Sequence, residues 1–266
     1  MNIVVIVQAR MSSSRLPGKV MKPLAGMPAL YRQIERIRRS SQADHIVVAT
    51  SIMPDDDEIV RLCEHYGIDV FRGHLLDLLD RHYQCARAFH ADAVVKIPSD
   101  CPLIDPAIID RTIQYFREHY ESVDFVSNLH PASYPDGNDV EVMRFSALET
   151  AWVNAKKMLE REHTTPYIWD SGLFRCANIA WETGKDYSMS HRWTLDYVED
   201  YECIRSVYDE LYDTNPCFTI DDILHLLEAK PDIASFNAEY VGVNWYRQHL
   251  DELQTIDSTQ TRPIAA

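Results

Sequence analysis

Short apolar runs alternate with amphipathic stretches through the first half of the chain. The apolar runs are three to six residues long, and the stretches between them span 12 to 16 residues. This rhythm is typical of βαβ units, in which helices cover a buried sheet. It therefore predicts an α/β fold with a mainly parallel central sheet flanked by helices. The expected strands are 3–8, 45–50, 69–71, 93–97 and 124–127, and the expected helices are 29–40, 55–66, 75–90 and 106–120.

The rhythm breaks after residue 130. A turn-rich segment, 131–138, is followed by an extended run at 139–144 and a helical pattern at 146–160. A strand near 173–181 and helices at 198–212 and 219–229 complete the pattern. The segment from Asp251 onward has no apolar periodicity, so we expect residues 251–266 to form a disordered tail.

Length and composition indicate a globular protein. With 266 residues and 46% apolar content, the chain can bury one large core. No apolar run approaches the roughly 20 residues of a membrane span, and the amino terminus lacks a signal-peptide pattern. We therefore expect a cytoplasmic protein without membrane contact. Six cysteines occur without a CxxC pair, which predicts free, mostly buried thiols.

Charge is distributed unevenly. The net charge of −15 argues against a general nucleic-acid binder, because phosphate contacts need clustered cations. Residues 1–40 nevertheless carry eight basic residues and one acid, Glu35. A local positive region on an acidic protein favours a compact polyanion such as a nucleoside triphosphate. Arg36, Arg38 and Arg39 are interpreted instead as a solvated helix face.

The loop after the first predicted strand is the strongest phosphate-binding candidate. In open α/β sheets, ligands bind beyond the carboxyl ends of the strands. Residues 8–19 combine three cations (Arg10, Arg15 and Lys19) with three serines and a glycine. Backbone N–H groups, arginine forks and a lysine charge together can hold a triphosphate. The loop matches neither the Walker A nor the GxGxxG pattern.

Two further loops carry weaker signals. Ser51, after the second strand, is open between a nucleobase or ribose contact and a structural role. Arg72 precedes Gly73 at the end of the third strand, where its planar donors can reach a base edge, and spacing alone leaves this role open too. Asp77 and Arg81, four residues apart, are interpreted as a surface salt bridge.

Carboxylates after later strands suggest a metal site. Asp100 follows the fourth strand, beside Ser99, and is predicted to bind Mg²⁺, which prefers one or two carboxylates together with phosphate oxygens and water. Asp105 is assigned to the N-cap of the next helix. Asp196 also ends an extended stretch before a helix and is the second candidate ligand, with Asp200 as the helix-start acid.

The extended run at 139–144 contributes candidate acceptor contacts. Asp139 and Glu141 lie two residues apart and therefore point to one face, where they are expected to bind acceptor hydroxyls or to assist the metal. His163 is ambiguous, and spacing alone favours a structural role.

These motifs together resemble a known family. The chain is similar, over roughly residues 1–210, to the SpsF-type (spore coat polysaccharide biosynthesis) cytidylyltransferases, which are relatives of the acylneuraminate and 3-deoxy-manno-octulosonate enzymes. The matching blocks fall in family order: Gln8-Ala9-Arg10-Met11, Arg15-Leu16-Pro17-Gly18-Lys19, Ala49-Thr50-Ser51, Val70-Phe71-Arg72-Gly73, Asp100-Cys101-Pro102-Leu103-Ile104-Asp105, Tyr134-Pro135-Asp136-Gly137, Asp139-Val140-Glu141, Arg161-Glu162-His163-Thr164 and Arg192-Trp193-Thr194-Leu195-Asp196.

The resemblance implies a Rossmann-like, GT-A type nucleotidyltransferase. It implies CTP as co-substrate, Mg²⁺ as cofactor, a small sugar-like acceptor, and a homodimer. Residues 1–250 would form the nucleotidyltransferase domain, with 130–180 as an acceptor or dimerisation lobe. By position, the catalytic residues are Arg10, Lys19, Asp100 and Asp196; the nucleotide contacts are Gln8, Ala9, Arg10, Arg15, Lys19, Ser51, Arg72 (near cytosine) and Ser99; the metal ligands are Asp100 and Asp196; and Asp139, Glu141 and His163 face the acceptor.

Two departures and two rival functions accompany this interpretation. Ser12 replaces the family's usual glycine, so its turn must avoid positive φ or adopt it with strain. Asn138 stands where leucine is common, beside the acceptor residues. The rivals are a glycosyltransferase of the same fold, which would transfer a sugar without releasing pyrophosphate, and a nucleotide-binding protein without catalytic activity.

Overall fold

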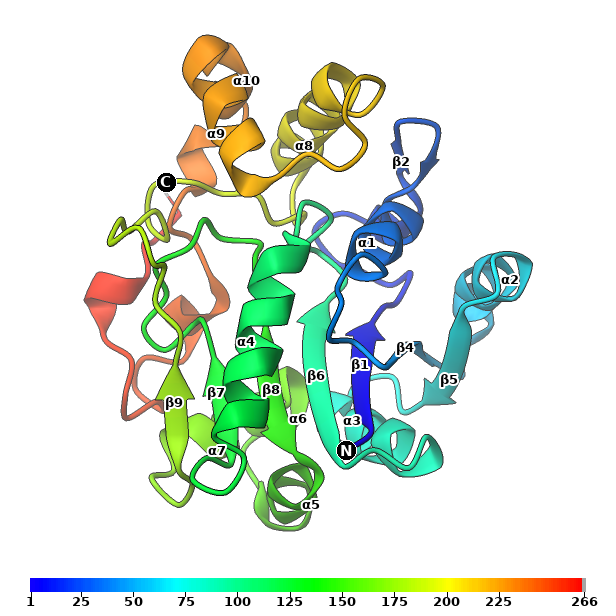
Figure 1. Ribbon diagram of the computed structural model, residues 1–266, viewed down its shortest axis with the longest axis vertical. Coiled ribbons are helices and arrows are strands. Elements are labelled where there is room, and N and C mark those ends of the chain that lie inside the picture. The colour runs from blue at the N-terminus through cyan, green and yellow to red at the C-terminus, as the bar shows by residue number, and fades with distance from the viewer. Residues whose placement is uncertain (265–266) are drawn as a thin grey trace.

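A seven-stranded mixed sheet forms the centre of the protein (Figure 1). The computed structural model describes residues 1–264. The strand order is β5-β4-β1-β6-β8-β7-β9, and a separate hairpin pairs β2 with β3. This arrangement confirms the predicted α/β class. The strands are β1 (Ile3–Gln8), β2 (Pro23–Leu24), β3 (Met27–Pro28), β4 (His45–Ser51), β5 (Asp69–Gly73), β6 (Ala93–Pro98), β7 (Phe125–Ser127), β8 (Glu141–Arg144) and β9 (Cys176–Asn178).

The direction of the chain across the sheet creates a binding crevice. β1 pairs in parallel with β4 on one side and with β6 on the other. The chain therefore moves outward from β1 to β4 and β5, and then returns to the opposite side of β1. Such a reversal leaves a crevice beyond the carboxyl ends of the two central strands. Gln8 and Pro98, which are register partners, mark this point. β8 is inserted antiparallel between β6 and β7.

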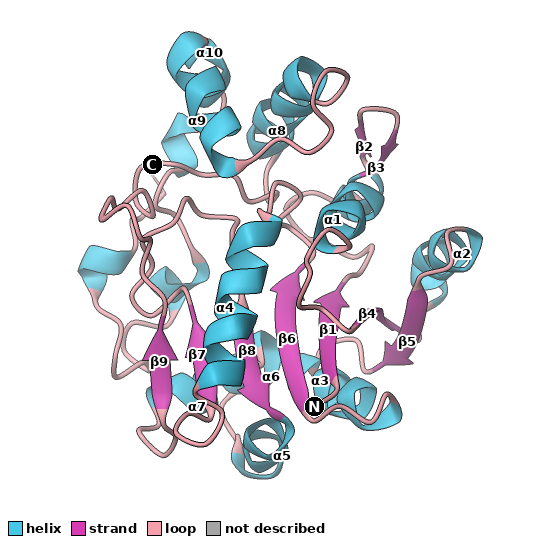
Figure 2. Ribbon diagram, in the orientation of Figure 1, coloured by secondary structure: helices cyan, strands magenta, loops and turns pink. Residues whose placement is uncertain are grey.

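Helices cover both faces of the sheet (Figure 2). Successive side chains of a strand point to opposite faces, so Ile3, Val5 and Val7 belong to one core and Val4 and Ile6 to the other. The first core is closed by α1 (Ala29–Ile37), α2 (Asp57–His65) and α4 (Pro106–Glu118); the second is closed by α3 (Leu78–Ala88), α5 (Phe145–Asn154), α6 (Met158–His163) and α7 (Pro166–Asp170).

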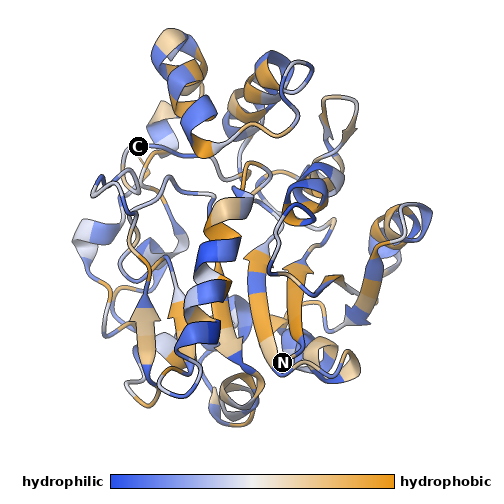
Figure 3. Cartoon of the chain, viewed as in Figure 1, coloured by the Kyte–Doolittle hydropathy of each residue, from blue (hydrophilic) through white to orange (hydrophobic). Residues whose placement is uncertain are grey.

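Burial on both faces explains why the central strands are continuous apolar runs. Figure 3 shows β1 and β6 almost uniformly hydrophobic, whereas the helices are banded. Lys96 is the charged residue within β6, and it is buried.

A third core lies beyond the carboxyl ends of the strands. It packs α8 (Val198–Leu211), α9 (Ile220–Ala229) and α10 (Pro231–Ser235) against the β2–β3 hairpin, in the upper part of Figure 1. Two predicted helix-start acids are confirmed: Asp105 accepts a hydrogen bond from the Ala107 N–H (2.9 Å), and Asp200 from the Tyr197 N–H (2.9 Å). Short 3₁₀ helices occur at Lys19–Met21, Pro54–Asp56, Ala238–Tyr240, Trp245–Gln248 and Ser258–Gln260.

The structure corrects the predicted disordered tail. Leu253 and Ile256 are buried in the second core, and the Asp170 carboxylate accepts hydrogen bonds from the Gln254 and Thr255 N–H groups. Two apolar residues three positions apart give no periodic signal, so only their tertiary contacts reveal this packing. Residues 265–266 of the predicted tail lie outside the described residues.

Other predictions need smaller corrections. The helix expected at 146–160 is divided into α5 and α6, and the strand expected at 173–181 is limited to β9. Segment 130–180 contributes β8 and β9 to the central sheet. Arg36 is not solvated: its side chain is buried and donates to the Ile104 and Phe218 carbonyl groups.

All six cysteines are free, and four of them are buried, as expected. Across residues 1–264, no helix has both the length and the apolar content to cross a bilayer.

Candidate functional site

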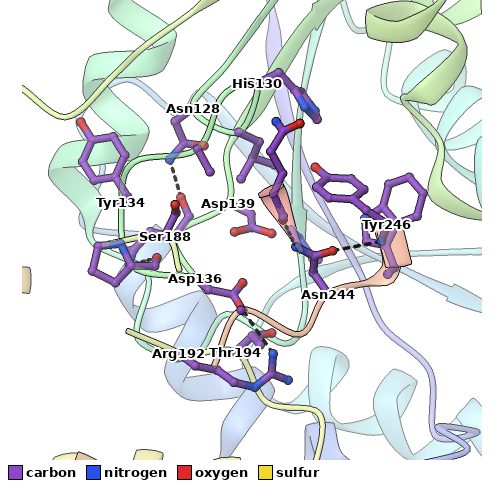
Figure 4. Close-up of a pocket in the computed structure, with 18 of the residues that line it drawn as sticks. Asn128, His130, Tyr134, Asp136, Asp139, Ser188, Arg192, Thr194, Asn244 and Tyr246 are labelled. Atoms are coloured by element: carbon purple, nitrogen blue, oxygen red, sulfur yellow. Dashed lines mark hydrogen bonds and ion pairs between the residues drawn. The ribbon is translucent and has the colours of Figure 1, made fainter. Parts of the chain in front are cut away.

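A cavity of about 410 Å³ opens at the sheet crevice (Figure 4). Gln8 and Pro98 mark its floor at the ends of β1 and β6, and three distant segments, 128–141, 186–196 and 242–260, supply much of its wall. One part, which we name the charged end, contains Arg15, Asp100, Asp136, Arg192 and Asp196. The other part, which we name the aromatic end, contains His130, His163, Trp169, Trp245 and Tyr246.

The charged end is centred on a lysine shared by two aspartates. Lys19 Nζ lies 3.2 Å from Asp100 Oδ2 and 2.8 Å from Asp196 Oδ1. Arg15 Nη2 also contacts Asp196 Oδ1, at 2.8 Å. Gly18 allows the chain to turn just before Lys19, because it adopts φ 67° in the left-handed region that favours glycine. The two aspartates predicted to share one metal therefore converge on one point.

Asp196 is held as a carboxylate. Burial alone would raise its pKa, but Lys19 and Arg15 outweigh burial and lower the pKa to about 2. Arg192 helps to position the segment that carries Asp196. Its guanidinium bonds the buried Asp200 carboxylate (Nε–Oδ1 2.8 Å) and reaches Asp136 at 3.3 Å.

Neighbouring acids give the charged end an excess of negative charge. Burial and the nearby Asp100 carboxylate raise the pKa of Asp139 to about 7. Burial also raises the pKa of Asp136, despite Arg192. In Figure 4, Asp136 and Asp139 both lie within the cavity. Repulsion of this kind is relieved by a bound cation, so the donor set suits a divalent metal.

This donor set does not form a complete protein cage. Within residues 1–264, no group of three or more His, Cys, Asp or Glu side chains is arranged to hold a metal ion. Two carboxylates alone are the set expected of a magnesium site completed by phosphate oxygens and water.

The aromatic end is built from stacked rings. His163 stacks on Trp245 with centroids 3.8 Å apart, and His130 stacks on Trp169 at 4.1 Å. Tyr246 contacts Trp169 edge-on at 6.3 Å. Burial lowers the pKa of His163 to about 3, so this ring is neutral. The stack shows that His163 has a packing role beside the cavity.

Glu141 lies between the two ends. It forms an ion pair with Lys96 and accepts a hydrogen bond from Thr165 Oγ1 at 2.7 Å. Burial would raise the pKa of Glu141, but Lys96 and His130 lower it to about 2. Glu141 is therefore an ionised residue that is already engaged within the protein.

The structure separates the sequence-predicted residues into three groups. Gln8, Arg15, Asp100, Asp139, Glu141, His163 and Asp196 line the cavity. Ala9, Arg10, Lys19 and Ser99 lie in the same loops but do not line it, although Lys19 contacts two aspartates that do. Ser51 and Arg72 belong to a separate cluster at the ends of β4 and β5.

That cluster surrounds Asp56, the N-cap residue of α2. The Asp56 carboxylate accepts from the Met11 N–H (2.7 Å) and the Ser51 N–H (3.2 Å), so it ties the phosphate loop to β4. Arg72 pairs with Asp57 (2.7 Å) and donates to the Ser51 carbonyl (3.0 Å). Both predicted nucleotide contacts are therefore engaged within the protein.

The predicted Asp77–Arg81 surface pair is wrong. Asp77 instead pairs with Arg161 at 2.5 Å, whereas the Arg81 side chain is buried. Their spacing of four residues predicted that Asp77 would pair with Arg81. Arg161, which is distant in sequence, pairs with Asp77 instead.

Both departures from the family pattern are accommodated. Ser12 is not among the residues with positive φ, so its turn avoids that strain. Asn138 is buried and holds its loop: it accepts from the Asp105 N–H (3.1 Å) and donates to the Pro135 carbonyl (3.1 Å).

Several cavity residues escaped the sequence reasoning. Lys96 had a visible signal, since it is a charge inside an apolar strand. Arg192 had a weaker one, because it precedes Asp196 and Asp200 by four and eight residues. Trp245 and Tyr246 had none, because they follow the region in which motifs were found.

Comparison with known proteins decides the family. A family model described as cytidylyltransferase matches residues 4–229. The chain belongs to the cytidylyltransferase family. It is thus a CTP-dependent nucleotidyltransferase, as the family resemblance implied.

Individual relatives agree with this assignment. The chain is similar to a cytidylyltransferase structure from Leptospira borgpetersenii, with a TM-score of 0.83 and 31% identity over 88% of this chain and 97% of that one. The spore coat polysaccharide biosynthesis protein SpsF of Bacillus subtilis is 29% identical over 88% of this chain and 97% of its own. A CMP:2-keto-3-deoxy-manno-octonic acid synthetase complexed with CTP shares the fold, with a TM-score of 0.60 and 17% identity over 79% of this chain and 99% of that one.

Proposed function

We propose that this cytidylyltransferase transfers CMP from CTP to a sugar, sugar acid or similar small acceptor in the synthesis of surface polysaccharide precursors. The observation that carries the proposal is the convergence of Asp100 and Asp196 on Lys19, at 3.2 and 2.8 Å, at the sheet crevice. The names of two similar proteins, SpsF and the octonic acid synthetase bound to CTP, support polysaccharide precursors and CTP respectively.

The cationic loop would receive the triphosphate. Arg10, Arg15 and Lys19 all follow β1 within twelve residues of Gln8, so their charges are available to the phosphates of one bound nucleotide. Gln8, Ala9 and Ser99 flank the same crevice and are proposed to contact the nucleotide. Ser51 and Arg72 remain predicted contacts for the ribose or the cytosine.

Asp100 and Asp196 would hold a divalent metal, which we propose to be Mg²⁺. When bound, the metal would neutralise negative charge on the α-phosphate and orient it. The excess of carboxylates around Asp139 supports a cation at this place.

The proposed reaction is a displacement at the α-phosphorus of CTP. An acceptor oxygen attacks the α-phosphorus of CTP, a new O–P bond forms, and the bond to the bridging oxygen breaks to release pyrophosphate. Arg15 and Lys19 stabilise the charge that develops on the departing group. Asp139, with a pKa of about 7, is suited to accept the acceptor's proton near neutral pH.

Pyrophosphate release with CTP tests this proposal. Asp100→Asn and Asp196→Asn are expected to lower kcat by roughly 10²–10³-fold, because each removes a preorganised charge from the transition state. Asp186→Asn is a matched control, since this acid lines the cavity but bonds its own loop at Ser188. Full activity of both variants would overturn the metal roles.

Two other outcomes point to different functions. Calorimetric CTP binding without turnover for any acceptor would favour a binding protein. Sugar transfer from a nucleotide sugar without pyrophosphate release would favour a glycosyltransferase. The homodimer and the cytoplasmic location remain predictions, and light scattering of the purified protein would test the former.

A further inference from the structure

Two tyrosines stack beside the charged end of the cavity. Tyr197 is the N-cap residue of α8, and Tyr240 is the last residue of the 3₁₀ helix Ala238–Tyr240. Their ring centroids lie 4.0 Å apart, and their planes are inclined by only 6°. Rings packed in this way restrict each other's orientation. The pair, which we name the tyrosine stack, therefore offers a fixed aromatic surface.

Both members of the stack are anchored to one buried carboxylate, Asp200. The Tyr197 N–H donates to Asp200 Oδ2 at 2.9 Å. Asn237 Nδ2 donates to Asp200 Oδ1 at 2.9 Å, and the Asn237 carbonyl accepts from the Tyr240 N–H at 3.0 Å. Asp200 is fully buried and is held in turn by Arg192. The same ion pair that supports the charged end thus also supports the stack.

The stack lies under a side chain of the phosphate loop. The Cζ atom of Arg15 is 5.3 Å from the centroid of the Tyr197 ring, within the range of a cation–π contact. Arg192, labelled in Figure 4 at the charged end, lies over the same ring at 5.7 Å. The Arg15 side chain is 41% exposed, so it has room to adopt other rotamers. A contact that limits these rotamers reduces the entropy lost when the guanidinium binds a phosphate.

The carboxylate partner of Arg15 is shared with other cations. Asp196 Oδ1 contacts both Arg15 and Lys19 at 2.8 Å, and Asp196 is also a proposed metal ligand. A metal on Asp196 would compete with Arg15 for this carboxylate and free its guanidinium for the phosphates. The face of Tyr197 is a contact that does not depend on the carboxylate. It can therefore hold Arg15 at the crevice when Asp196 is shared.

We propose that the tyrosine stack positions Arg15 for the triphosphate of CTP. Tyr197 is the residue that contacts Arg15, and Tyr240 supports it from a segment beyond residues 4–229, the region that the cytidylyltransferase family model matches. This inference rests on the proposed function and deepens it, because it adds two positioning residues to the nucleotide site.

Calorimetric binding of CTP, with MgCl₂ and without an acceptor, tests the stack. Tyr197→Leu is expected to raise the Kd of CTP about three- to tenfold, whereas Tyr197→Phe keeps the aromatic face and should bind CTP like the wild type. Tyr240→Leu should raise the Kd about two- to threefold, because it removes only the support. This variant leaves Tyr197 in place and serves as the test if Tyr197→Leu does not fold.

A second arginine–tyrosine contact provides the matched control. Arg144 Cζ lies 3.8 Å from the Tyr120 ring centroid, and neither residue lines the cavity. Tyr120→Leu removes the same kind of contact and should leave the Kd of CTP unchanged. A Kd that is unchanged in both Tyr197→Leu and Tyr240→Leu, or that rises as much in Tyr120→Leu, overturns the inference.

A double-mutant cycle distinguishes positioning of Arg15 from a general structural role. Arg15→Met is expected to raise the Kd of CTP about tenfold or more. If Tyr197 acts through Arg15, adding Tyr197→Leu to Arg15→Met should raise the Kd no further. Additive losses would mean that Tyr197 acts independently of Arg15, and they would also overturn the inference.

These results separate the two proposals. Failure of the wild-type protein to bind CTP would refute the proposed function itself. CTP binding that depends on Arg15 but not on Tyr197 or Tyr240 would refute only the present inference.

Discussion

The charged and aromatic ends of the cavity are built by different means. The charged end joins the loops after β1 and β6 to the irregular segment that precedes α8, and ion pairs such as Arg192–Asp200 (2.8 Å) hold its carboxylates. The aromatic end depends on residues 242–260, which we name the C-terminal strap and whose position is set by buried side chains such as Leu253 and Ile256. The charged end is thus fixed by ion pairs between loops, whereas the aromatic end is fixed by the apolar packing of a segment that is distant in sequence.

The largest effect is expected at Arg192, which belongs to the charged end and also holds the Val243 carbonyl. Arg192→Met should lower the free energy of unfolding by about 3–5 kcal/mol, because it leaves the fully buried Asp200 carboxylate without its cation. The same change also frees the Val243 carbonyl of the strap. Denaturant unfolding measures the effect, with Arg205→Met as an exposed control. A loss below about 1 kcal/mol would mean that Arg192 does not hold the charged end.

A smaller effect is expected from loosening the strap alone. Ile256→Ala should cost about 2–4 kcal/mol, because it leaves a cavity in the second core. Thermal unfolding measures the effect against Ile264→Ala, which alters an exposed isoleucine further along the chain. If the two variants are equally stable, residues 251–264 do not pack as described and the original expectation of a disordered tail returns.

The smallest expected effect is a change in the free energy of unfolding that depends on pH. Burial raises the pKa of Asp139 to about 7 in the folded protein. The charged carboxylate that forms by pH 8 therefore destabilises the folded state. As the pH falls through 7 toward 4, the Asp139 carboxyl group is protonated in the folded state before it is protonated in the unfolded state, and the destabilisation disappears. Asp139→Asn should therefore stabilise the metal-free protein at pH 8 and be nearly neutral below about pH 4.

Unfolding curves of wild type and Asp139→Asn across this range measure the difference, and Asp186→Asn provides the control. A stability gain that does not change with pH would contradict the assignment of the effect to the Asp139 charge.

The residues of the charged end were largely accessible from sequence. Asp100 and Asp196 were singled out because each ends an extended stretch before a helix. Asp100 follows β6 of the parallel sheet, whereas Asp196 follows no strand and is brought to the same place by its contact with Lys19. Arg72 and Ser51 carried weaker signals, and they bond within a separate cluster around Asp56 and Asp57. A motif indicates which residue types are available, whereas side-chain partners depend on neighbours that are distant in sequence.

The order of apolar runs along the chain determined the fold class, the central strands and the position of the basic loop, because these depend on local periodicity and on the known direction of parallel strands. Only the tertiary structure decided that Lys19 joins Asp100 to Asp196, that Arg192 anchors the strap, and that Trp245 stacks on His163. These contacts join residues up to 177 positions apart, and no local pattern encodes which distant partners a side chain will meet.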